Sequence, residues 1–466
     1  MQKSASIFIL VSLLGAAPSD GADLSQAYID SLVNDPVLGA AKQGYEARRE
    51  VVPQSRSGLL PSINMSGLAS ENRRTLPGSV VVDPGTGLLV PAGTTTFRDH
   101  GWQAELIQPL FDVEAWFTYK SSKARREQAQ YDYRFTEQEL IVRVAAAYLD
   151  VLRAQALVES TEADEAAVQR QLEQVQQRFD VGLVAITDVL ESTAALDLAV
   201  VRRIQADGDL DIFFETLSTL TGVNYPEVAR LSEKLPIINP EPLDESQWVA
   251  TALAENLEVR SAQEQLAAAE QELKARLSGH LPTLDAQVSY SSFTTHGSAF
   301  LGGKSETEIY ALRMQLPIYQ GGFVSSRVRE ARARRREARE FLRGRKLVVS
   351  RDTRNLLQAV TTDVARVKAR LRAIRSTESA LEAIQTGYEV GTRNIVDVLE
   401  AQQRLFRSQF DYADSRYKYV LGLLLLKQSA GTLTPTDIEE VNAFSDMSDP
   451  VRRRATLTRQ GLPPRT

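Results

Sequence analysis

The chain has 466 residues, 43% hydrophobic and 24% charged, which excludes a disordered or collagen-like protein and leaves room for two or three domains. It has no cysteine, which excludes disulfides, cysteine-based zinc sites, thiol catalysis and a lipidated N-terminal cysteine. Only three histidines are present, and the formal net charge of −6 argues against general nucleic-acid binding.

The first residues have the pattern of a secretory signal peptide. Lys3 is followed by an apolar run at residues 7–14 and by the small residues 15–17. We therefore predict a signal peptide over residues 1–21. The alternative is a buried N-terminal strand, but export explains the rest of the sequence better.

The chain contains an internal repeat with an offset of 209 residues. The segment FDVG at residues 179–182 recurs as YEVG at 388–391, and ITDVLE at 186–191 recurs as IVDVLE at 395–400. A repeat of this length means that one structural unit is built twice. We predict a first repeat at 22–222, a linker or equatorial segment at 223–250, a second repeat at 251–431, and a C-terminal equatorial segment and tail at 432–466.

Each repeat contains a long stretch without proline. Prolines are absent from residues 110–225 and from residues 318–434, which predicts long uninterrupted helices. Apolar residues recur there at coiled-coil spacing, namely Ile141, Val144, Tyr148 and Val151, then Leu357, Val360, Val364, Val367, Leu371 and Ile374. The predicted helices are 113–178, 186–221, 321–387 and 394–430. At about 1.5 Å per residue the first would be about 100 Å long.

The segments before each long helix have a different period. Apolar and polar residues alternate strictly at about 283–293 and 306–316, and more weakly at about 62–70 and 97–107. The extra residues of the first repeat lie in a segment rich in Gly, Pro and Thr, residues 77–96, which we predict to be a surface loop.

Alternating segments of about ten residues suit either transmembrane barrel strands or a half-buried soluble hairpin. After residue 17 no run of 18 or more apolar residues occurs, so a membrane would have to be crossed by strands. The signal peptide and the repeat favour a barrel. Because membrane barrels begin at about eight strands, a chain with four strands must oligomerise to close one.

Several segments carry a family resemblance. They are LPIYQGG at 316–322, GYEVGTR at 387–393 leading into IVDVL at 395–399, and VGLVAITD at 181–188. In this order on a repeat, they resemble the TolC family of outer-membrane channel-tunnel proteins over nearly the whole mature chain. The resemblance implies a mixed α and β fold in a homotrimer. Its 12-stranded membrane β-barrel, four strands per chain, is continued by a long α-helical coiled-coil barrel.

The resemblance also implies a location and partners. The protein would lie in the outer membrane of a Gram-negative bacterium, among outer membrane lipid, and project into the periplasm. It would open when a periplasmic membrane fusion adaptor and an inner-membrane ABC or RND transporter dock. It would then serve type I protein secretion, multidrug efflux or both, as a passive duct without a cofactor.

The resemblance assigns a latch that holds the periplasmic end closed. The matching residues are Thr187, Asp188, Tyr388 and Arg393. An Arg–Asp pair with supporting hydroxyls can hold two helix ends together and still be broken by a docking partner. Without the resemblance, ordinary capping and surface pairing would explain the same residues.

Two further sets of residues follow from the resemblance. Asp397 and Glu400 lie three apart on one helix face and match an acidic constriction, where Glu400 replaces the usual Asp. The alternative is a solvated acidic face. The glycine turns resemble adaptor-contact tips, although they also suit simple chain reversal; their residues are Val181, Gly182, Leu183, Val390, Gly391 and Thr392.

Two basic segments remain. Ten basic residues lie between Arg327 and Lys346, interleaved with Glu330, Glu337 and Glu340. In an exported helix below a barrel we expect a solvated face near lipid headgroups, not a nucleic-acid site. The Arg-rich tail from Arg452 onward either wraps the middle of the tunnel or is disordered.

Nothing in the sequence indicates an enzyme. There is no phosphate-binding loop, no pair of metal-ligand histidines and no spacing that suggests a catalytic triad. We therefore predict a trimeric exit duct that binds no nucleic acid. The alternative is an exported coiled-coil periplasmic adaptor or scaffold without a pore, which would leave the four alternating segments unexplained.

Overall fold

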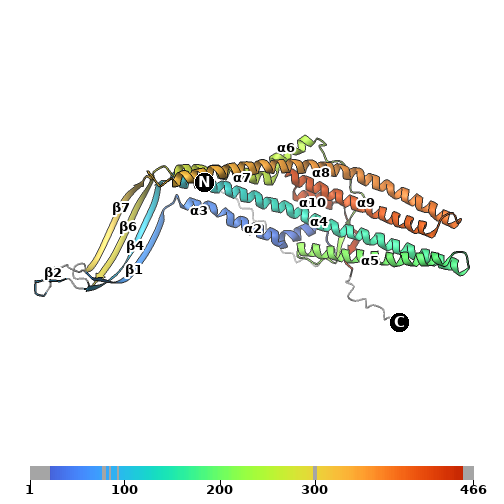
Figure 1. Ribbon diagram of the computed structural model, residues 1–466, viewed down its shortest axis with the longest axis horizontal. Helices are drawn as coiled ribbons and strands as arrows, with labels where there is room; N and C mark the ends of the chain where they lie inside the picture. Colours follow the sequence, from blue (N-terminus) through green and yellow to red (C-terminus); the bar gives the residue numbers. More distant parts are fainter. Residues whose placement is uncertain (1–20, 76–79, 83–84, 92–93, 298–301, 455–466) are drawn as a thin grey trace. The chain divides into compact units, whose positions relative to one another are not determined.

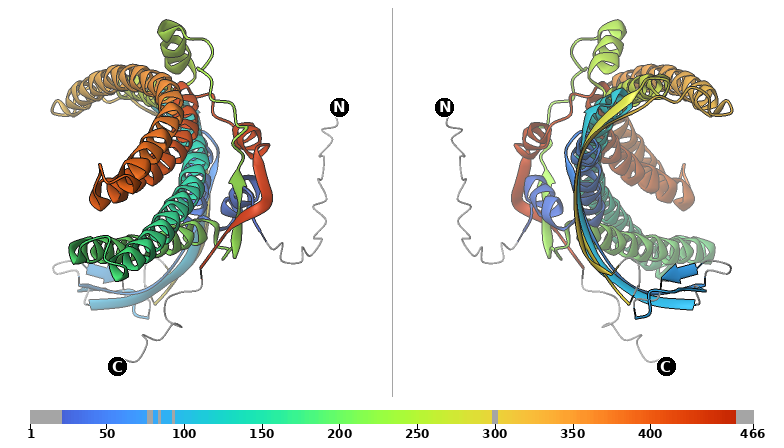
Figure 2. Two further views of the ribbon diagram at one scale, coloured as in Figure 1. Left: turned by 90° about the vertical axis from the view of Figure 1, so that its right-hand side faces the viewer. Right: turned by 90° about the vertical axis from the view of Figure 1, so that its left-hand side faces the viewer.

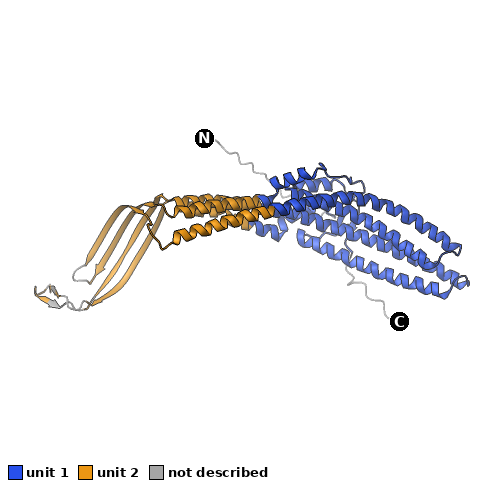
Figure 3. Ribbon diagram, turned by 45° about the horizontal axis from the view of Figure 1, so that its top comes forward, with its two compact units in different colours: residues 1–42, 133–259, 346–466 blue, residues 43–132, 260–345 orange. Residues whose placement is uncertain are grey.

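The computed structural model describes residues 21–75, 80–82, 85–91, 94–297 and 302–454. The predicted signal peptide up to residue 20, part of the loop at 77–96 and the tail beyond residue 454 lie outside the described residues. The chain forms two compact units (Figures 1 and 3). Unit 1 comprises residues 1–42, 133–259 and 346–466, and unit 2 comprises residues 43–132 and 260–345.

Unit 2 is built on a four-stranded antiparallel sheet. Its strands are β1 (Ser62–Thr75), β4 (Thr94–Phe111), β6 (Thr283–His296) and β7 (Gly303–Gln315), in the spatial order β1-β4-β6-β7. Within the described residues, β1 and β7 have one neighbour each in this sheet, so each leaves one edge unpaired. The sheet is strongly curved (Figure 2).

The strands carry exposed apolar side chains. Tyr310, Leu312 and Met314 of β7 are 75%, 72% and 70% exposed, and their spacing of two places them on one face. At the centre of the sheet, a Cβ on Gly101 would lie 2.4 Å from the Ser292 carbonyl oxygen, so only glycine allows the close approach of β4 and β6. The short strands β2 (Val80–Val82) and β3 (Leu89–Pro91) form a separate hairpin between β1 and β4.

The helices of unit 2 follow the same order as its strands. They are α2 (Pro36–Arg49), α3 (Val51–Ser57), the first part of α4 (Val113–Asp180), α7 (Leu257–Ser278) and the first part of α8 (Phe323–Glu389). Arg48 of α2 pairs with Asp132 of α4 at 3.3 Å, and the Ser121 hydroxyl of α4 donates to the Ala268 carbonyl of α7 at 3.0 Å.

A small apolar cluster then joins α7 to α8, made of Leu273, Val328 and Ala331. The row is therefore α2 and α3, then α4, α7 and α8, with α8 at the edge that continues from β7. Of the helices in the described ranges, none has the length together with the apolar character that crossing a bilayer would require.

Unit 1 is a curved layer of four helices. The rest of α4 packs with α5 (Ile186–Thr221), and the rest of α8 packs with α9 (Ile395–Ala430), as the end-on views show (Figure 2). The apolar positions that recur at coiled-coil spacing in α4 form the core, where Tyr148, Phe214 and Leu426 are fully buried. The Tyr148 hydroxyl donates to the Ala229 carbonyl at 2.6 Å, and burial raises the pKa of this phenol.

Small elements cover the convex side of this layer (Figure 2). They are α1 (Leu24–Asn34), β5 (Glu227–Leu231), α10 (Pro435–Asn442) and β8 (Ser445–Arg452), while α6 (Glu245–Glu255) lies beside them. β5 pairs with β8, and Ala22 forms a parallel bridge to Val228. Residues from both ends of the chain and from the predicted linker thus form one small sheet.

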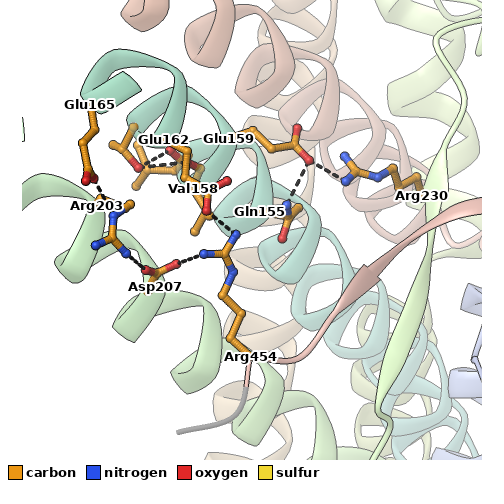
Figure 4. A network of polar contacts seen from close by, with 11 residues as sticks. Gln155, Val158, Glu159, Glu162, Glu165, Arg203, Asp207, Arg230 and Arg454 are labelled. Atoms are coloured by element: carbon orange, nitrogen blue, oxygen red, sulfur yellow. Dashed lines mark hydrogen bonds and ion pairs between the residues drawn. The ribbon is translucent and has the colours of Figure 1, made fainter. Parts of the chain in front are cut away.

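The described part of the Arg-rich tail is bound to acidic side chains (Figure 4). Arg454 pairs with Glu162 of α4 at 2.6 Å and with Asp207 of α5 at 2.7 Å. Asp207 is also held by Arg203 at 2.9 Å. Arg452 and Arg453 pair with acidic residues of β5 and α5 in the same way. Because these contacts join three elements of unit 1, the residues up to 454 are an ordered part of the fold.

Candidate functional site

The predicted site residues lie at the ends of the two helix hairpins of unit 1. α4 ends at Asp180 and α5 begins at Ile186. Gly182 has a φ of 77°, the left-handed region that favours glycine, and the Leu183 N–H donates to the Arg178 carbonyl at 2.8 Å. This glycine turn closes the end of α4 and reverses the chain.

The second hairpin ends in the same way but with a stronger helix start. α8 ends at Glu389, Gly391 has a φ of 79°, and α9 begins at Ile395. The Asn394 side chain accepts from the Asp397 N–H at 2.8 Å, and the Asp397 carboxylate accepts from the Asn394 N–H at 3.4 Å. This capping box satisfies the free N–H groups at the start of α9, so Asp397 has a structural role in addition to its charge.

An apolar cluster packs the two hairpin ends against each other. Val175 and Val189 of the first hairpin and Ile395 and Val398 of the second are buried together. Partly buried residues surround them, including Tyr388. The cluster therefore holds the four helix ends in contact, and any separation of the hairpins would expose these side chains to water.

Tyr388 contacts a residue that the sequence analysis did not identify. The Arg178 guanidinium lies 5.3 Å from the centre of the Tyr388 ring, within the range of a cation–π interaction. The Tyr388 hydroxyl is buried, and within the described residues it has no hydrogen-bond partner. A buried hydroxyl without a partner is costly, so this group is available to a donor or acceptor that another chain or another conformation would supply.

Arg393 pairs with Asp397 within one helical turn. The distance between Arg393 Nη1 and Asp397 Oδ2 is 3.8 Å, and the two side chains are 58% and 35% exposed. A Cβ on Gly387 would lie 2.8 Å from Arg393 Cγ, so the glycine leaves room for the arginine to fold back over the turn. The structure thus joins one predicted latch residue to one predicted constriction residue.

The other predicted latch residues are not joined across the hairpins. The Thr187 hydroxyl lies 3.4 Å from the carboxylate of its neighbour Asp188. In the part of the chain that the structure describes, neither residue forms a hydrogen bond or ion pair with Tyr388 or Arg393. The four latch residues therefore lie on one end of the unit without the predicted contacts between the hairpins in a single chain.

Glu400 lies in a groove with other charged residues, apart from Asp397. The groove has a volume of about 350 Å³ and runs between α4, α5 and α9; Asp164, Glu191 and Arg202 also line it. Glu191 is the repeat equivalent of Glu400. Asp164 and Arg202 pair at 2.7 Å, so one positive charge faces three carboxylates. This imbalance makes the groove acidic.

The turns themselves present apolar side chains to solvent. Val181, Leu183 and Val390 are 70%, 73% and 70% exposed. Exposed apolar residues that cluster at one place often mark a protein-binding surface. A second groove, about 590 Å³ in volume and lined mainly by polar residues, runs between α4 and α8 beside Tyr388.

The chemistry that this arrangement offers is electrostatic. Within the described ranges, no group of three or more His, Cys, Asp or Glu residues gathers where it could hold a metal ion. The residues of the candidate site that the sequence analysis did not identify are Arg178, Glu191 and Asn394. Asn394 could have been found, because its spacing to Asp397 is that of a capping box. Glu191 could have been found from the internal repeat, because it is the equivalent of Glu400, whereas Arg178 carries no such signal.

The comparisons with known proteins agree with this fold. A family model for outer membrane efflux proteins matches residues 27–223 and 248–432. The outer membrane protein TolC of Vibrio cholerae is 32% identical over 447 residues, which cover 95% of this chain and 98% of the relative. The alkaline protease secretion protein AprF of Pseudomonas aeruginosa is 27% identical over 438 residues, or 93% of this chain and 90% of the relative.

A solved structure supports the fold at lower identity. CusC superposes with a TM-score of 0.75 at 17% identity, and the match covers 90% of this chain and 95% of CusC. At this identity the likeness concerns the fold alone. The family match covers both repeats, and the two relatives named above align over 90% or more of their length. The chain therefore belongs to the outer membrane efflux protein family.

Proposed function

We propose that three copies of this chain form one exit duct, in which their sheets close into a 12-stranded barrel and their helices form a coiled-coil barrel. Family membership makes the chain an outer membrane exit duct for efflux and secretion in a Gram-negative bacterium. The closure of the barrel is supported by one observation. The sheet is open and curved, and its edge strands β1 and β7 are unpaired in the described chain. An unpaired edge with exposed apolar residues is stable only if another strand and an apolar solvent cover it.

The duct is passive in this proposal. It works with a periplasmic membrane fusion adaptor and an inner-membrane ABC or RND transporter, is surrounded by outer membrane lipid, and catalyses no reaction. The exposed apolar turns with Val181, Leu183 and Val390 are the adaptor-contact tips, together with Gly182, Gly391 and Thr392. An exported adaptor or scaffold without a pore would have no use for the four-stranded sheet.

The latch in this proposal exchanges partners. Arg393 holds Asp397 of its own turn in one state and reaches Asp188 and Thr187 in the closed state. Tyr388, whose buried hydroxyl lacks a partner in the described chain, would gain one in the closed state. Since the Arg393–Asp397 pair is exposed and of modest strength, and Asp188 would offer a second carboxylate, a docking partner can shift the balance between the two contacts.

The acidic constriction in this proposal is formed by Asp397 and Glu400 from three chains. Carboxylates that converge on a narrow axis repel each other and attract cations. The capping box sets the position of Asp397 at the start of α9. Glu400 lies one turn further along α9, beside Glu191, so its carboxylate also adds to the negative charge of the neighbouring groove.

The trimeric duct can be tested directly. The purified protein in detergent is expected to have the mass of three chains by light scattering, and to form discrete ion-conducting channels when it is added to a planar lipid bilayer. A monomer that conducts no current would contradict the duct and would leave the scaffold as the explanation of the helices.

The latch is tested by removing its donors. Arg393→Ser combined with Tyr388→Phe is expected to raise single-channel conductance. The closed state loses the Tyr388 hydrogen bond and the contacts of Arg393 with Asp188 and Thr187, worth about 1 kcal/mol each, whereas the other state loses only the Arg393–Asp397 pair. Tyr388→Phe keeps the ring over Arg178 and removes only the hydroxyl, so its effect separates the hydrogen bond from the cation–π contact. Unchanged conductance in a folded trimer would show that these residues do not hold the duct closed.

A further inference from the structure

The basic segment at the start of α8 divides into faces with different environments. Val328 and Ala331 are buried against α7. On one side of this buried face, Arg327 pairs with Glu114 of α4 at 3.7 Å and Arg334 pairs with Glu330 at 2.9 Å. These arginines are accounted for by packing and by ion pairs within the unit.

The other side carries a stripe of arginines. Its residues are exposed and recur at intervals of three and four, which places them on one helix face; we refer to Arg329, Arg332, Arg336, Arg339 and Arg343 as the arginine stripe. Among the described residues, the first four have no ion-pair partner, and Arg343 reaches only Glu340 at 3.5 Å. The stripe is about 21 Å long at about 1.5 Å per residue.

The arginine stripe is unfavourable for the stability of the helix that carries it. Like charges at intervals of three and four residues repel and destabilise a helix. Several other arginines of unit 2 are matched by acidic partners, as in the pair between Arg276 and Glu114 at 2.6 Å. An unmatched row on one face is therefore better explained by an anionic partner outside the chain.

A second copy of the chain does not supply that partner. If copies pack edge to edge, α8 meets α2 and α3, which form the other edge of the helix row. The carboxylates of Glu46 and Glu50 there are already held by Arg49, at 2.8 and 3.9 Å. Arg48 is held by Asp132 at 3.3 Å, and Arg56 adds a positive charge, so α2 and α3 offer the stripe no unpaired carboxylate.

A lipid surface reaches too little of the stripe. The helices of unit 2 run away from one end of its sheet (Figure 3), and Arg329 lies six residues, about 9 Å, beyond the first residue of α8. The headgroup layer is about 5 to 8 Å thick on each side of a bilayer, and its attraction falls off within about 8 Å at physiological salt. Headgroups below the barrel would therefore attract the first two arginines, whereas the other three lie about 20 to 30 Å beyond the start of α8.

We propose that the arginine stripe binds a carboxylate-bearing polymer of the periplasm, the peptide-linked glycan of the cell wall. The proposal rests on the proposed function, because it takes the strands as the membrane-spanning part and α8 as periplasmic. Guanidinium groups bind carboxylates through two parallel hydrogen bonds, and several arginines in a row can engage successive carboxylates of one polymer. Three copies would form a girdle of arginines around the duct.

The test measures binding to purified cell-wall sacculi. The protein is placed in nanodiscs of phosphatidylcholine, which carry no net charge, and is co-sedimented with sacculi at several salt concentrations. The wild-type protein is expected to bind, with an affinity that falls as salt rises. The variant R329Q/R332Q/R336Q/R339Q is expected to bind about tenfold more weakly or worse, because it loses four charge-assisted contacts.

A matched variant controls for net charge. R351Q/K368Q/R372Q/R375Q removes four exposed positive charges from the same helix, farther from the strands, and is expected to bind like the wild type. Glutamine is a good helix former, so both variants keep the helix. Both must remain trimeric and conduct current as the wild type does, which separates a failure of this proposal from a failure of the duct itself.

Three outcomes would overturn the proposal. The first is equal binding of sacculi by the wild type and the stripe variant. The second is undiminished binding to sacculi whose carboxylates have been amidated, which would exclude the carboxylate as the bound group. The third concerns phosphatidylglycerol that the protein retains when it is purified from mixed micelles. If the stripe variant loses this lipid while its binding to sacculi is unchanged, lipid headgroups are the partner.

Discussion

Replacing Asp397 with Asn and Glu400 with Gln together is expected to abolish most of the cation selectivity of the pore. It is also expected to weaken block by a trivalent cation complex, added from the periplasmic side, by about tenfold or more. Two unit charges at 4 Å interact by about 1 kcal/mol even at the dielectric constant of water, and more where water is scarce. In the proposed constriction, two carboxylates from each of three chains would therefore make a strong site for a trivalent ion.

The choice of amides keeps the fold unchanged. Asp397 closes the capping box with Asn394 and pairs with Arg393. An alanine would remove the cap, which costs about 1 kcal/mol, together with the charge. Asparagine retains an oxygen that can accept the Asn394 N–H, so the variant changes the charge while the helix start persists.

The single variants show how much each of the two carboxylates contributes to selectivity and block. Asp397→Asn is expected to have the larger effect, because Glu400 lies beside Glu191 in the neighbouring groove. The measurements are reversal potentials in asymmetric salt and the concentration of the trivalent complex that halves the current. Full block and full selectivity in the double variant would mean that neither carboxylate reaches the axis.

Replacing Phe214 with Ala is expected to destabilise unit 1 by about 3 to 5 kcal/mol, the usual cost of removing a large buried side chain and leaving a cavity. Phe214 is fully buried on α5, between Leu210 and Leu217, which are also fully buried. The loss is large because this core joins the first helix hairpin to the elements on the convex side of the layer.

The measurement is the urea midpoint for loss of helical circular dichroism in the detergent-solubilised protein. Phe214→Leu is the control, since it keeps most of the volume and should cost less than about 1.5 kcal/mol. A midpoint for Phe214→Ala equal to that of the control would show that the cavity collapses or that this core does not limit the stability of the unit.

The long helices are the part of the fold that the sequence determines most directly. A helix was expected at 113–178 and another at 321–387, and α4 and α8 span Val113–Asp180 and Phe323–Glu389. The reason is local: prolines break helices, and a glycine in the left-handed conformation lets the chain reverse, as at Gly182 and Gly391. The positions of the two glycine turns follow from the same physics.

The strands were expected in the right places but with shorter bounds. The alternation predicted a strand at about 97–107, whereas β4 spans Thr94–Phe111. The first residues of β4, Thr94 to Thr96, belong to the strand because they pair with β1, and the last, from Gln108 to Phe111, because they pair with β6. Strand length is decided by the partner strand, and the pattern of a single segment contains no information about it.

The small sheet of unit 1 could not be predicted. β5 pairs with β8, and Ala22 joins them, although these segments are short and lack a clear alternation. Their pairing depends on the long helices, which bring distant segments to one side of the layer. The arginines up to Arg454 likewise find their acidic partners only in the folded unit.

In the candidate site, too, some features follow from the sequence and others only from the tertiary structure. The sequence by itself determined the turns, the start of α9 and the acidic residues on its face, because capping and helical spacing act over three or four residues. Only the tertiary structure decided that Arg178 lies over Tyr388 and that Glu400 lies beside Glu191. These contacts join helices from different repeats, and they exist because the apolar cluster at the hairpin ends packs the four helices together.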